Sequence, residues 1–347
     1  MYLGDVGEHD FEQLQILRDD AQGVLAFVAI HDTRLGPAFG GIRRWSYRRS
    51  SEALVDALRL AEAMTWKCAV AGVAGGGGKA VIVDGPGVDR EAAYRLIGRY
   101  VEEMGGRYFT GPDVGTEAAD LAVVAQHTRY VARPDLAEPT AIGVFAGIRS
   151  IGRRLEFDGV RGMRVLVQGL GDVGSRLVGL LVGAGAEVTV TDVRPEAIEA
   201  LAERQAVTVV EPGELLAVEA DVYAPCALGG VVHDLSLQHL RVRAIAGSAN
   251  NVLASPEHGA ELFRRGILYA PDFVIGGGAL VYGATQQLDG RAPDRARIEA
   301  IGELVGEVID AAIAEGLPPE VVALRMARER VAAAPARPYL PRERRER

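Results

Sequence analysis

The alternation of apolar and polar positions divides the first third of the chain into strands and helices. Short apolar runs predict strands, whereas apolar residues spaced by three and four predict one face of a helix. The two kinds of element follow one another here, which is typical of α/β proteins. Strands are expected at 23–31, 80–83 and 108–110, and helices at 51–67 and 91–104.

The remainder of the chain shows a more regular pattern, in which short β-branched runs alternate with helical or loop segments. A helix at about 140–155 opens this part, and a proline-started helix at 318–334 closes it. Such a series predicts a doubly wound parallel sheet, because strands buried on both faces are short and largely apolar. The expected strands are 164–168, 187–191, 207–210, 221–224, 244–246 and 267–269.

Chain length then sets the domain organisation. A chain of 347 residues exceeds what one core usually organises, so we expect two α/β domains. The first covers 1–135, and the second, with the doubly wound sheet, covers 140–317. The C-terminal segment 318–347 is expected to leave the second domain and pack back on the first.

Composition excludes several classes of partner. The net charge of −9 argues against nucleic acid, because phosphate binding needs a cationic face. The arginine-rich segment 337–347 is interpreted as a solvated terminus rather than a binding arm. Cys68 and Cys226 match neither a C-x-x-C motif nor a metal-binding spacing, which fits a reducing compartment and predicts no metal site.

Residues 1–10 lack the apolar core of a signal peptide, and no apolar run reaches the ~18–20 residues of a membrane span. We therefore expect a cytoplasmic protein without membrane association.

A glycine pattern in the second domain predicts a dinucleotide site. Gly169, Gly171 and Gly174 form G-x-G-x-x-G directly after a predicted strand and at the start of a helix. Such glycines let the backbone approach a pyrophosphate at the positive helix N-terminus. Asp192 ends the next strand, where it would accept hydrogen bonds from a ribose 2′-hydroxyl and repel a 2′-phosphate. NAD is therefore favoured over NADP, although Arg194 could soften that preference. The alternative is a tight turn without a ligand.

Two lysines stand in unusual surroundings for this residue type. Lys67 ends an apolar helix, and Lys79 follows four glycines and precedes a strand. Burial lowers the pKa of a lysine, which can then act as a base near neutral pH, and a second lysine can hold a carboxylate. A Walker phosphate loop is excluded, because Val73 and Ala80 stand where it needs a glycine and a hydroxyl. A glycine-rich turn with a solvent-reaching lysine remains the structural alternative.

Asp113 has two interpretations of equal weight. It follows Gly111 and Pro112 in a turn after a predicted strand. Its carboxylate could cap a helix that begins near Thr116. It could equally transfer protons beside Lys79.

A series of ordered segments resembles the Glu/Leu/Phe/Val amino-acid dehydrogenases over nearly the whole chain. The resemblance implies a first domain for substrate binding and oligomerisation and a second, Rossmann-type domain for NAD. It also implies a homo-oligomer, a dimer or an octamer, and an apolar edge strand at 24–30 would suit its interface. The segments are Gly36–Gly41, Met64–Lys67, Gly76–Lys79, Thr110–Gly115, Pro139–Ala141, Val167–Gly171, Ala224–Gly230, Ala246–Asn251 and Tyr269–Phe273.

The reaction that the resemblance implies is reversible oxidative deamination of an L-amino acid to a 2-oxo acid and ammonia, with NAD accepting a hydride. Lys67 would pair with the substrate carboxylate, Lys79 would activate the attacking water and move protons, and Asp113 would assist. Phe39 and Gly40 would line the substrate pocket. The residues that would hold the cofactor are Thr140, Gly169, Gly171, Asp172, Val173, Gly174, Asp192, Cys226, Ala227, Ala246 and Asn250.

Several further positions bear on the substrate. Gly111 and the segment 267–273 resemble the phenylalanine dehydrogenase branch, in which Gly111 would enlarge the pocket toward an aromatic side chain. Gly115 instead follows the leucine-type pattern, so branched-chain amino acids remain the second possible substrate class after aromatic ones. The chain departs from the family at Gly276, where members carry an asparagine expected to hydrogen-bond the substrate amino group.

The loss of that asparagine predicts an active enzyme with a shifted substrate. One hydrogen bond to a charged group is worth about 1.5–3 kcal/mol, which slows a reaction without abolishing it. Two other classes stay open: an NAD-binding regulator without turnover, and an oxidoreductase acting on an imine or a hydroxy acid. Retention of Lys67, Lys79 and Asp113 argues against the regulator.

Overall fold

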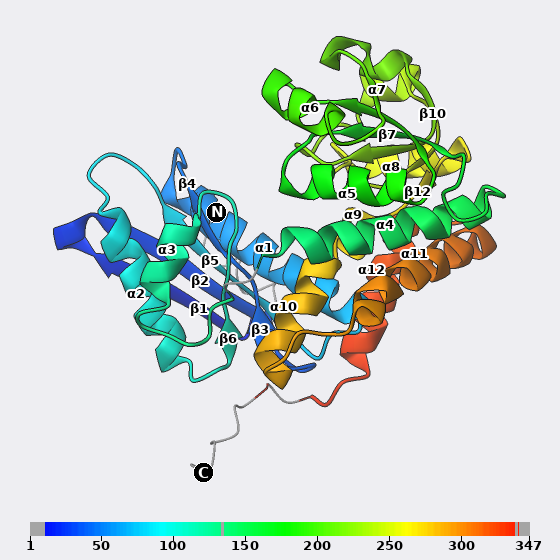
Figure 1. The fold of residues 1–347 in the computed structure, drawn as a ribbon. Helices are drawn as coiled ribbons and strands as arrows, with labels where there is room; N and C mark the ends of the chain where they lie inside the picture. The colour runs from blue at the N-terminus through cyan, green and yellow to red at the C-terminus, as the bar shows by residue number, and fades with distance from the viewer. Residues whose placement is uncertain (1–10, 133–134, 337–338, 340–347) are drawn as a thin grey trace. The chain divides into compact units, whose positions relative to one another are not determined.

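The chain divides into two compact units in the computed structural model, which describes residues 11–132, 135–336 and 339 (Figure 1). The predictions for segments 1–10 and 337–347 therefore fall outside the described residues, apart from Tyr339. The units differ from the predicted domain limits, because 283–291 belong to the first unit and 318–326 to the second. The first unit comprises 1–134, 283–291 and 327–347, and the second comprises 135–282 and 292–326.

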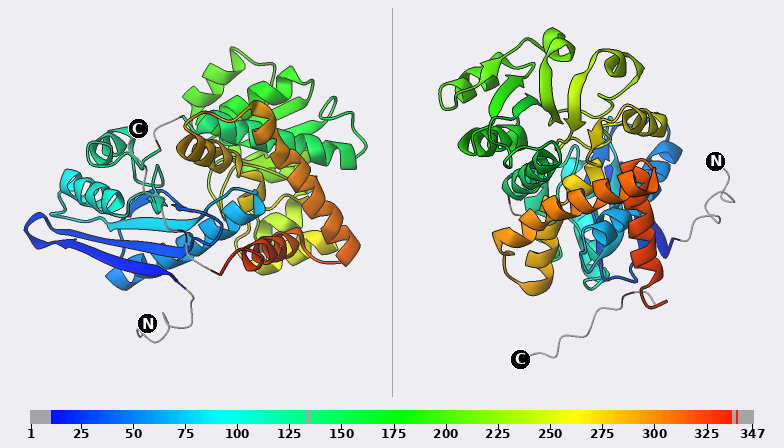
Figure 2. Two further views of the ribbon diagram at one scale, coloured as in Figure 1. Left: turned by 90° about the horizontal axis from the view of Figure 1, so that it is seen from below. Right: turned by 90° about the vertical axis from the view of Figure 1, so that its right-hand side faces the viewer.

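The first unit is built on a mixed sheet. Its six strands, counted over the described residues, run in the order β1-β2-β5-β3-β6, with β4 also paired to β5. Figure 2 shows this sheet, drawn in blue and cyan, from two further sides. Antiparallel pairing joins β1, β2 and β5, whereas β3, β4 and β6 run parallel to their neighbours. The strands are β1 (Gln13–Asp19), β2 (Val24–Asp32), β3 (Ala38–Phe39), β4 (Ile42–Trp45), β5 (Gly76–Val83) and β6 (Tyr108–Phe109). Helices α1 (Ser50–Val70), α2 (Arg90–Glu103) and α3 (Ala118–Val124) also lie in this unit.

The expected edge strand at 24–30 is wrong. β2 pairs with β1 on one side and with β5 on the other, so it lies inside the sheet. The edge is β1, which the apolar pattern did not reveal. Only Leu17 of β1 is buried, and Ile16 is 54% exposed, so the strand lacks a clean alternation of apolar and polar positions.

The glycines before Lys79 form a strand rather than a turn, which corrects the alternative of a glycine-rich turn. β5 begins at Gly76, four residues earlier than the apolar run at 80–83 suggested. A Cβ on Gly77 would lie 2.1 Å from the Ala61 carbonyl oxygen of α1, so the strand needs glycine where the helix crosses it. Ala57 and Ala61 of α1 share a buried core with Val81, which fixes β5 against the helix.

The second unit contains a parallel sheet. Its strands, again counted over the described residues, run in the order β12-β11-β10-β7-β8-β9. Taken by position in the chain, this is the order 3-2-1-4-5-6 of the Rossmann fold, so the predicted doubly wound sheet is confirmed. The strands are β7 (Arg164–Gln168), β8 (Glu187–Thr191), β9 (Thr208–Val209), β10 (Glu219–Pro225), β11 (Arg241–Ile245) and β12 (Leu268–Tyr269).

One long helix escaped the sequence prediction. α11 (Arg295–Glu315) lies along α4 (Ala137–Arg154), and a Cβ on Gly302 would approach the Ala146 carbonyl oxygen to 2.5 Å. Arg154 Nε also donates to Asp310 at 2.7 Å across the same pair of helices. The other helices are α5 (Asp172–Gly183), α6 (Pro195–Ala202), α7 (Asp234–His239), α8 (Pro256–Arg264), α9 (Asp272–Ile275), α10 (Gly278–Asp289) and α12 (Pro319–Ala332).

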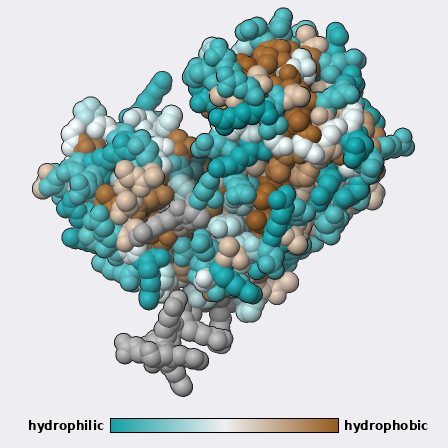
Figure 3. All heavy atoms as spheres, in the orientation of Figure 1, coloured by the Kyte–Doolittle hydropathy of each residue, from teal (hydrophilic) through white to brown (hydrophobic). Residues whose placement is uncertain are grey.

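On the face drawn in Figure 3, hydrophilic side chains predominate and hydrophobic ones show in smaller areas between them. Among the residues with a described structure, no helix combines the length and apolar character needed to cross a bilayer. Over the same residues, no group of three or more histidine, cysteine, aspartate or glutamate side chains is placed to hold a metal ion.

Candidate active site

Lys79 is held inside the first unit against a carboxylate. It lies on β5 with 4% of its surface exposed, and its Nζ is 3.1 Å from Asp113 Oδ2. Two backbone hydrogen bonds from β4, at residues 42 and 44, reach the segment after β6 at Gly111 and Val114 and fix Asp113 between them. The sheet thus brings together the two residues that the sequence proposed as catalytic.

Asp113 does not cap a helix, so that interpretation is wrong. α3 begins at Ala118, and the N–H of Glu117 before it donates to Asp120 at 2.7 Å. The Asp113 carboxylate points instead to Lys79 and to Arg43. The interpretation of Asp113 as a partner in proton transfer stays a prediction.

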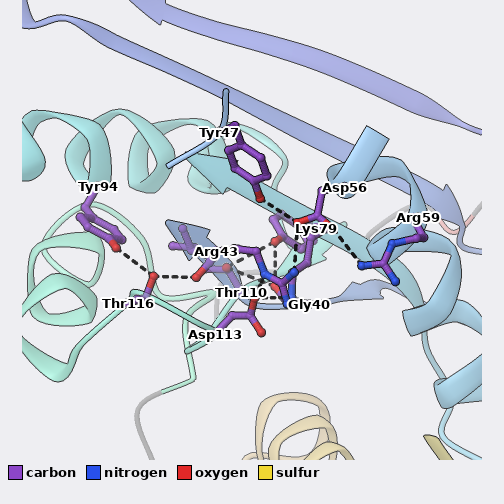
Figure 4. A network of polar contacts seen from close by, with 12 residues as sticks. Gly40, Arg43, Tyr47, Asp56, Arg59, Lys79, Tyr94, Thr110, Asp113 and Thr116 are labelled. Atoms are coloured by element: carbon purple, nitrogen blue, oxygen red, sulfur yellow. Dashed lines mark hydrogen bonds and ion pairs between the residues drawn. The ribbon is translucent and has the colours of Figure 1, made fainter. Parts of the chain in front are cut away.

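A network of charges and hydroxyls continues behind Asp113 (Figure 4). Arg43, on β4, donates from Nε to Asp113 Oδ2 at 2.8 Å and from Nη1 to Asp56 Oδ2 at 3.0 Å. Tyr47 donates its hydroxyl to the same Asp56 oxygen at 2.7 Å, and Arg59 reaches the other oxygen at 3.0 Å. Sequence reasoning missed Arg43 and Asp56.

The pKa values of Lys79 and Asp113 are shifted in the directions that suit acid–base catalysis. Burial lowers the pKa of Lys79, because desolvation disfavours the ammonium form, and the Asp113 charge only partly opposes this. Burial would raise the pKa of Asp113, but the charges of Lys79 and Arg43 outweigh it and lower that pKa. The amine therefore loses its proton more readily while its partner stays ionised, which suits a general base.

Lys67 lies in the last turn of α1, on the same unit as Lys79. Lys67 and Lys79 are the only lysines in the chain, although lysine and arginine together number 38. Arginine keeps its proton under all ordinary conditions, so a chain that otherwise uses arginine retains lysine where an amine is needed. This count was a signal in the sequence that pattern analysis passed over.

Cys68, next to Lys67, is fully buried and donates from Sγ to the Gly76 carbonyl oxygen at 3.2 Å. Burial raises the pKa of the Cys68 thiol to about 12, so this thiol stays protonated and unreactive. The contact ties the end of α1 to the start of β5.

The predicted pocket residues lie around the bend between β3 and β4. A Cβ on Gly40 would meet the Gly78 carbonyl oxygen at 1.7 Å, so glycine is required there. Phe39 is 6% exposed and stacks on Phe109 with 5.2 Å between ring centroids. A Cβ on Gly111 would touch Ala132 at 3.4 Å. Their contact with a substrate stays a prediction.

The three fingerprint glycines of the second unit have three different surroundings. Gly169 has a φ of +97°, a turn conformation that L side chains rarely adopt. A Cβ on Gly174 would lie 1.9 Å from the Gly169 carbonyl oxygen, so glycine lets α5 pack against the end of β7. At Gly171, a Cβ would meet nothing within 4 Å. That open backbone at the first residues of α5, Asp172 and Val173, fits a pyrophosphate cradle.

Asp192 lies beside this turn. Its Oδ2 accepts from the Leu170 N–H at 2.6 Å, and its Oδ1 accepts from Arg194 through the backbone N–H at 2.9 Å and Nε at 3.2 Å. Burial would raise the pKa of Asp192, but the Arg194 hydrogen bonds and the Leu170 N–H lower it. An ionised carboxylate at this position fits a ribose hydroxyl.

The other predicted cofactor residues follow the ends of neighbouring parallel strands. Cys226 and Ala227 follow β10, where Ala227 packs against Gly169. Ala246 follows β11, and Asn250 is exposed a few residues later. The ends of β7 and β10 flank the point where the strand order reverses, the usual ligand position in such sheets. Thr140 lies instead in the first turn of α4.

Gly276 is the C-cap of α9, and its backbone conformation does not demand glycine. Its φ of −76° and ψ of 11° are accessible to any residue. Gly278 is different, because a Cβ there would lie 2.1 Å from the Pro139 carbonyl oxygen and 3.3 Å from the Thr140 Cα. The segment that departs from the family therefore packs against the start of α4.

Comparison with known proteins places these features in one family. Residues 12–130 match the Glu/Leu/Phe/Val dehydrogenase, dimerisation domain. Leucine dehydrogenase of Geobacillus stearothermophilus is 40% identical over 335 residues, which cover 93% of this chain and 91% of that protein. The chain belongs to the Glu/Leu/Phe/Val dehydrogenase family. Phenylalanine dehydrogenase of Bacillus thermotolerans is 38% identical over 345 residues, covering 94% of this chain and 90% of that protein.

A solved structure agrees with this assignment. L-tryptophan dehydrogenase from Nostoc punctiforme superposes with a TM-score of 0.85 at 35% identity, covering 95% of this chain and 98% of that one. The predicted resemblance and the enzyme class are therefore confirmed: the protein is an amino-acid dehydrogenase, an oxidoreductase. Enzymes of this class use a nicotinamide cofactor and act on amino acids.

Proposed function

We propose that the protein catalyses the NAD-dependent oxidative deamination of an L-amino acid with a large apolar side chain to the 2-oxo acid and ammonia. The observation that carries the proposal is the buried Lys79, whose pKa is lowered and whose Nζ contacts Asp113. A surface lysine would be protonated and useless as a base, so this environment favours proton transfer.

The roles of the residues follow from their chemistry. Lys67, as the second amine of the same unit, holds the substrate carboxylate by a charge-assisted hydrogen bond. Lys79 takes a proton from the attacking water and returns protons to the departing ammonia, while Asp113 keeps the amine oriented. The nicotinamide cofactor, when bound, accepts the hydride from the substrate Cα.

NAD is the proposed cofactor rather than NADP. The fingerprint turn at Gly171 would hold the pyrophosphate, and the Asp192 carboxylate would accept from the ribose 2′-hydroxyl. A 2′-phosphate would meet the negative charge of Asp192. Arg194, which contacts the same carboxylate, provides partial compensation for NADP.

Aromatic amino acids are the first candidates for the substrate, and branched-chain amino acids are the second. Gly111 removes a side chain next to Asp113, and relatives of similar identity act on phenylalanine, leucine and tryptophan by name. Gly276 has no side chain to bind the substrate amino group, so we infer that another group or a water molecule does so. We also propose a homo-oligomer formed through the first unit, which light scattering would reveal.

A substrate panel tests the proposal. Purified protein is assayed for NADH and NADPH formation with aromatic, branched-chain and other L-amino acids, and the 2-oxo acids are tested in reverse. The expected result is NADH formation with an aromatic or branched-chain substrate and a reverse reaction that requires ammonia. Binding of NAD without turnover on any amino acid would overturn the proposal, and NADH oxidation by an oxo acid without ammonia would indicate a hydroxy-acid enzyme.

A further inference from the structure

Arg43 connects the catalytic carboxylate to a second, non-catalytic one. We propose that Arg43 is a positioning residue that fixes Asp113 as a permanently ionised partner of Lys79, and that Asp56 and Tyr47 hold Arg43 in place. The inference rests on the proposed function of the lysine site and sharpens it. It makes Asp113 a fixed anion, with Lys79 as the group that gains and loses the proton.

The geometry at Asp113 supports this division of roles. Arg43 Nε and Lys79 Nζ contact the same oxygen, Oδ2, at 2.8 Å and 3.1 Å. A guanidinium does not lose its proton, so one of the two cations on this oxygen is permanent. Protonation of Asp113 would remove one of the two anionic partners of Arg43, whose side chain is only 20% exposed, and would leave it Asp56 alone. The carboxylate therefore stays charged while Lys79 titrates.

The support behind Arg43 is equally specific. Asp56, on α1, has a 15% exposed side chain and accepts from Arg43, Tyr47 and Arg59. These bonds anchor the guanidinium through its Nη1, whereas Nε is the atom that reaches Asp113. Because Asp56 is on the helix and Arg43 on β4, the contact couples the orientation of Asp113 to the packing of α1 on the sheet.

The charges around Lys79 allow a test, because positive and negative neighbours shift its pKa in opposite directions. Arg43 lowers the pKa of Lys79 by repulsion, whereas Asp113 and the more distant Asp56 raise it. Tyr47 and Tyr108 also face this network, and burial raises their pKa values far enough to keep both hydroxyls neutral. Arg59 contacts the other oxygen of Asp56 and carries a permanent charge. Removing Arg43 and removing Asp56 should therefore move the titration of Lys79 in opposite directions.

Steady-state kinetics give the first measurement. Arg43→Gln should lower kcat roughly tenfold to a hundredfold with little change in KM, the cost of a lost hydrogen bond to a charged group. In this variant, the rise of kcat with increasing pH should occur at a higher pH than in the wild type, because Lys79 becomes more basic. Asp56→Asn should shift that rise to lower pH, and Arg43→Lys, which keeps the charge, should leave its position unchanged and restore part of kcat.

Arg107→Gln is the matched control. Arg107 lies in the same unit and pairs through Nη2 with Glu12 at 2.7 Å, and its side chain is 23% exposed, close to the 20% of Arg43. The variant removes one largely buried positive charge without changing the contacts of Asp113 or Asp56, so it should leave the pH profile of the wild type in place. Equal effects of Arg43→Gln and Arg107→Gln would overturn the inference, because they would indicate a merely structural role for the arginines of this unit.

The scarcity of lysine allows a direct measurement that does not depend on turnover. In protein labelled with ¹³C at lysine Cε, only Lys67 and Lys79 give signals, and Lys67→Arg assigns them. The Lys79 signal should titrate at higher pH in Arg43→Gln and at lower pH in Asp56→Asn. An unchanged Lys79 titration in both variants would overturn the inference even if the wild type were active. If the wild type forms no NADH while Lys79 shifts as expected, the proposed function fails and the placement of Arg43 stands.

Chemical rescue separates positioning from folding. Arg43 lines a surface pocket of about 580 Å³ together with Trp45, Tyr47, Asp56 and Arg59, through which a small cation can enter. Ethylguanidinium at millimolar concentration should raise kcat of Arg43→Ala at least severalfold and should have no effect on Lys79→Ala. A folded Arg43→Ala in which ethylguanidinium restores neither the rate nor the Lys79 titration would overturn the inference.

Discussion

The lysine site of the first unit and the dinucleotide turn of the second are built in opposite ways. Around Lys79, the contacts are made by charged side chains, and Asp113, Arg43 and Asp56 each pair with an opposite charge. A Cβ on Gly171 would meet nothing within 4 Å, and in the proposed cofactor site the backbone would supply the contacts to the ligand. The chemistry of the first site thus depends on which residues are present, and that of the second on which atoms are missing.

This difference predicts different sensitivities to mutation. A side-chain network loses function when one charge is removed, because its partner is then left buried and uncompensated. A backbone cradle tolerates changes of charge nearby but not the addition of a single carbon. Experiments that remove a charge from one region and add a methyl group to the other should separate catalysis from binding.

Removing the amine of Lys79 should give the largest effect. Lys79→Ala takes away the proposed base, so kcat should fall about 10²–10⁴-fold, the usual contribution of general acid–base catalysis. NAD binding, which we assign to the backbone cradle, should be unchanged, as measured by isothermal titration. Loss of NAD affinity in this variant would contradict the proposed separation, whereas Lys79→Arg should be nearly as inactive because a guanidinium cannot act as a base.

Adding a methyl group to the cradle should give the next effect. A Cβ on Gly171 meets nothing in the protein, so Gly171→Ala should fold with the wild-type melting temperature. It should nevertheless weaken NAD binding roughly tenfold to a hundredfold, because overpacking against the pyrophosphate costs about 1–3 kcal/mol.

Gly174→Ala is the counterpart of that variant. Its Cβ would lie 1.9 Å from the Gly169 carbonyl oxygen, so this variant should lose stability as well as binding. Thermal melts with and without NAD distinguish the two. Equal melting temperatures for both variants would show that the glycines do not have separate roles.

How far the sequence predicted the structure also differs between the two regions. The turn from Gly169 to Gly174 and the strands around it were predicted almost residue by residue, because strand, turn and helix are contiguous and each has a local pattern. The fold of the second unit followed from the same regularity. Its long helix α11 was missed although Ile298, Ile301 and Val305 have helical spacing, an oversight rather than a missing signal.

The lysine site was predicted only in part. Lys79 and Asp113 were identified because they lie in recognisable segments, but Arg43 is one arginine among many and has no local signature. Its role comes from Asp113, seventy positions away in the chain. β3 and β4 were missed as well, since Ala38–Phe39 and Ile42–Trp45 are too short for an apolar alternation to register. Such contacts are set by the sheet, and no single segment encodes them.

A buried carboxylate in the second unit sharpens the contrast with Asp113. Glu320 Oε2 is buried without a hydrogen-bond partner among the described residues, and Gly259 provides the space beside it. Burial, with a further contribution from Asp272, raises the pKa of Glu320, whereas the cations around Asp113 lower that of Asp113. The presence or absence of a neighbouring cation therefore decides the direction in which the pKa of a buried carboxylate shifts.

Glu320→Gln should therefore stabilise the protein near neutral pH by about 1–3 kcal/mol, because the neutral amide removes the buried charge, which is costlier to desolvate than a neutral polar group. A raised folded-state pKa means that the stability of the wild type is full below the unfolded-state pKa and falls as the pH rises through the folded-state pKa. The advantage of the variant should thus grow from acidic to neutral pH, as measured by denaturant unfolding. A constant difference between the two proteins across that range would refute it.

The smallest expected effect concerns the charge beside the cradle. Arg194 contacts Asp192 through Nε at 3.2 Å, but its side chain is 52% exposed, so solvent screens the attraction between the two charges. Arg194→Ala should leave NAD affinity within about twofold and weaken NADP binding by a few fold, since the 2′-phosphate loses the compensating charge of this guanidinium. Arg164→Ala is the control, because Arg164 pairs with Asp221 at 3.4 Å with a 47% exposed side chain, at the opposite end of β7. Equal changes in the NAD to NADP ratio for both variants would mean that net charge, and not the contact with Asp192, sets cofactor choice.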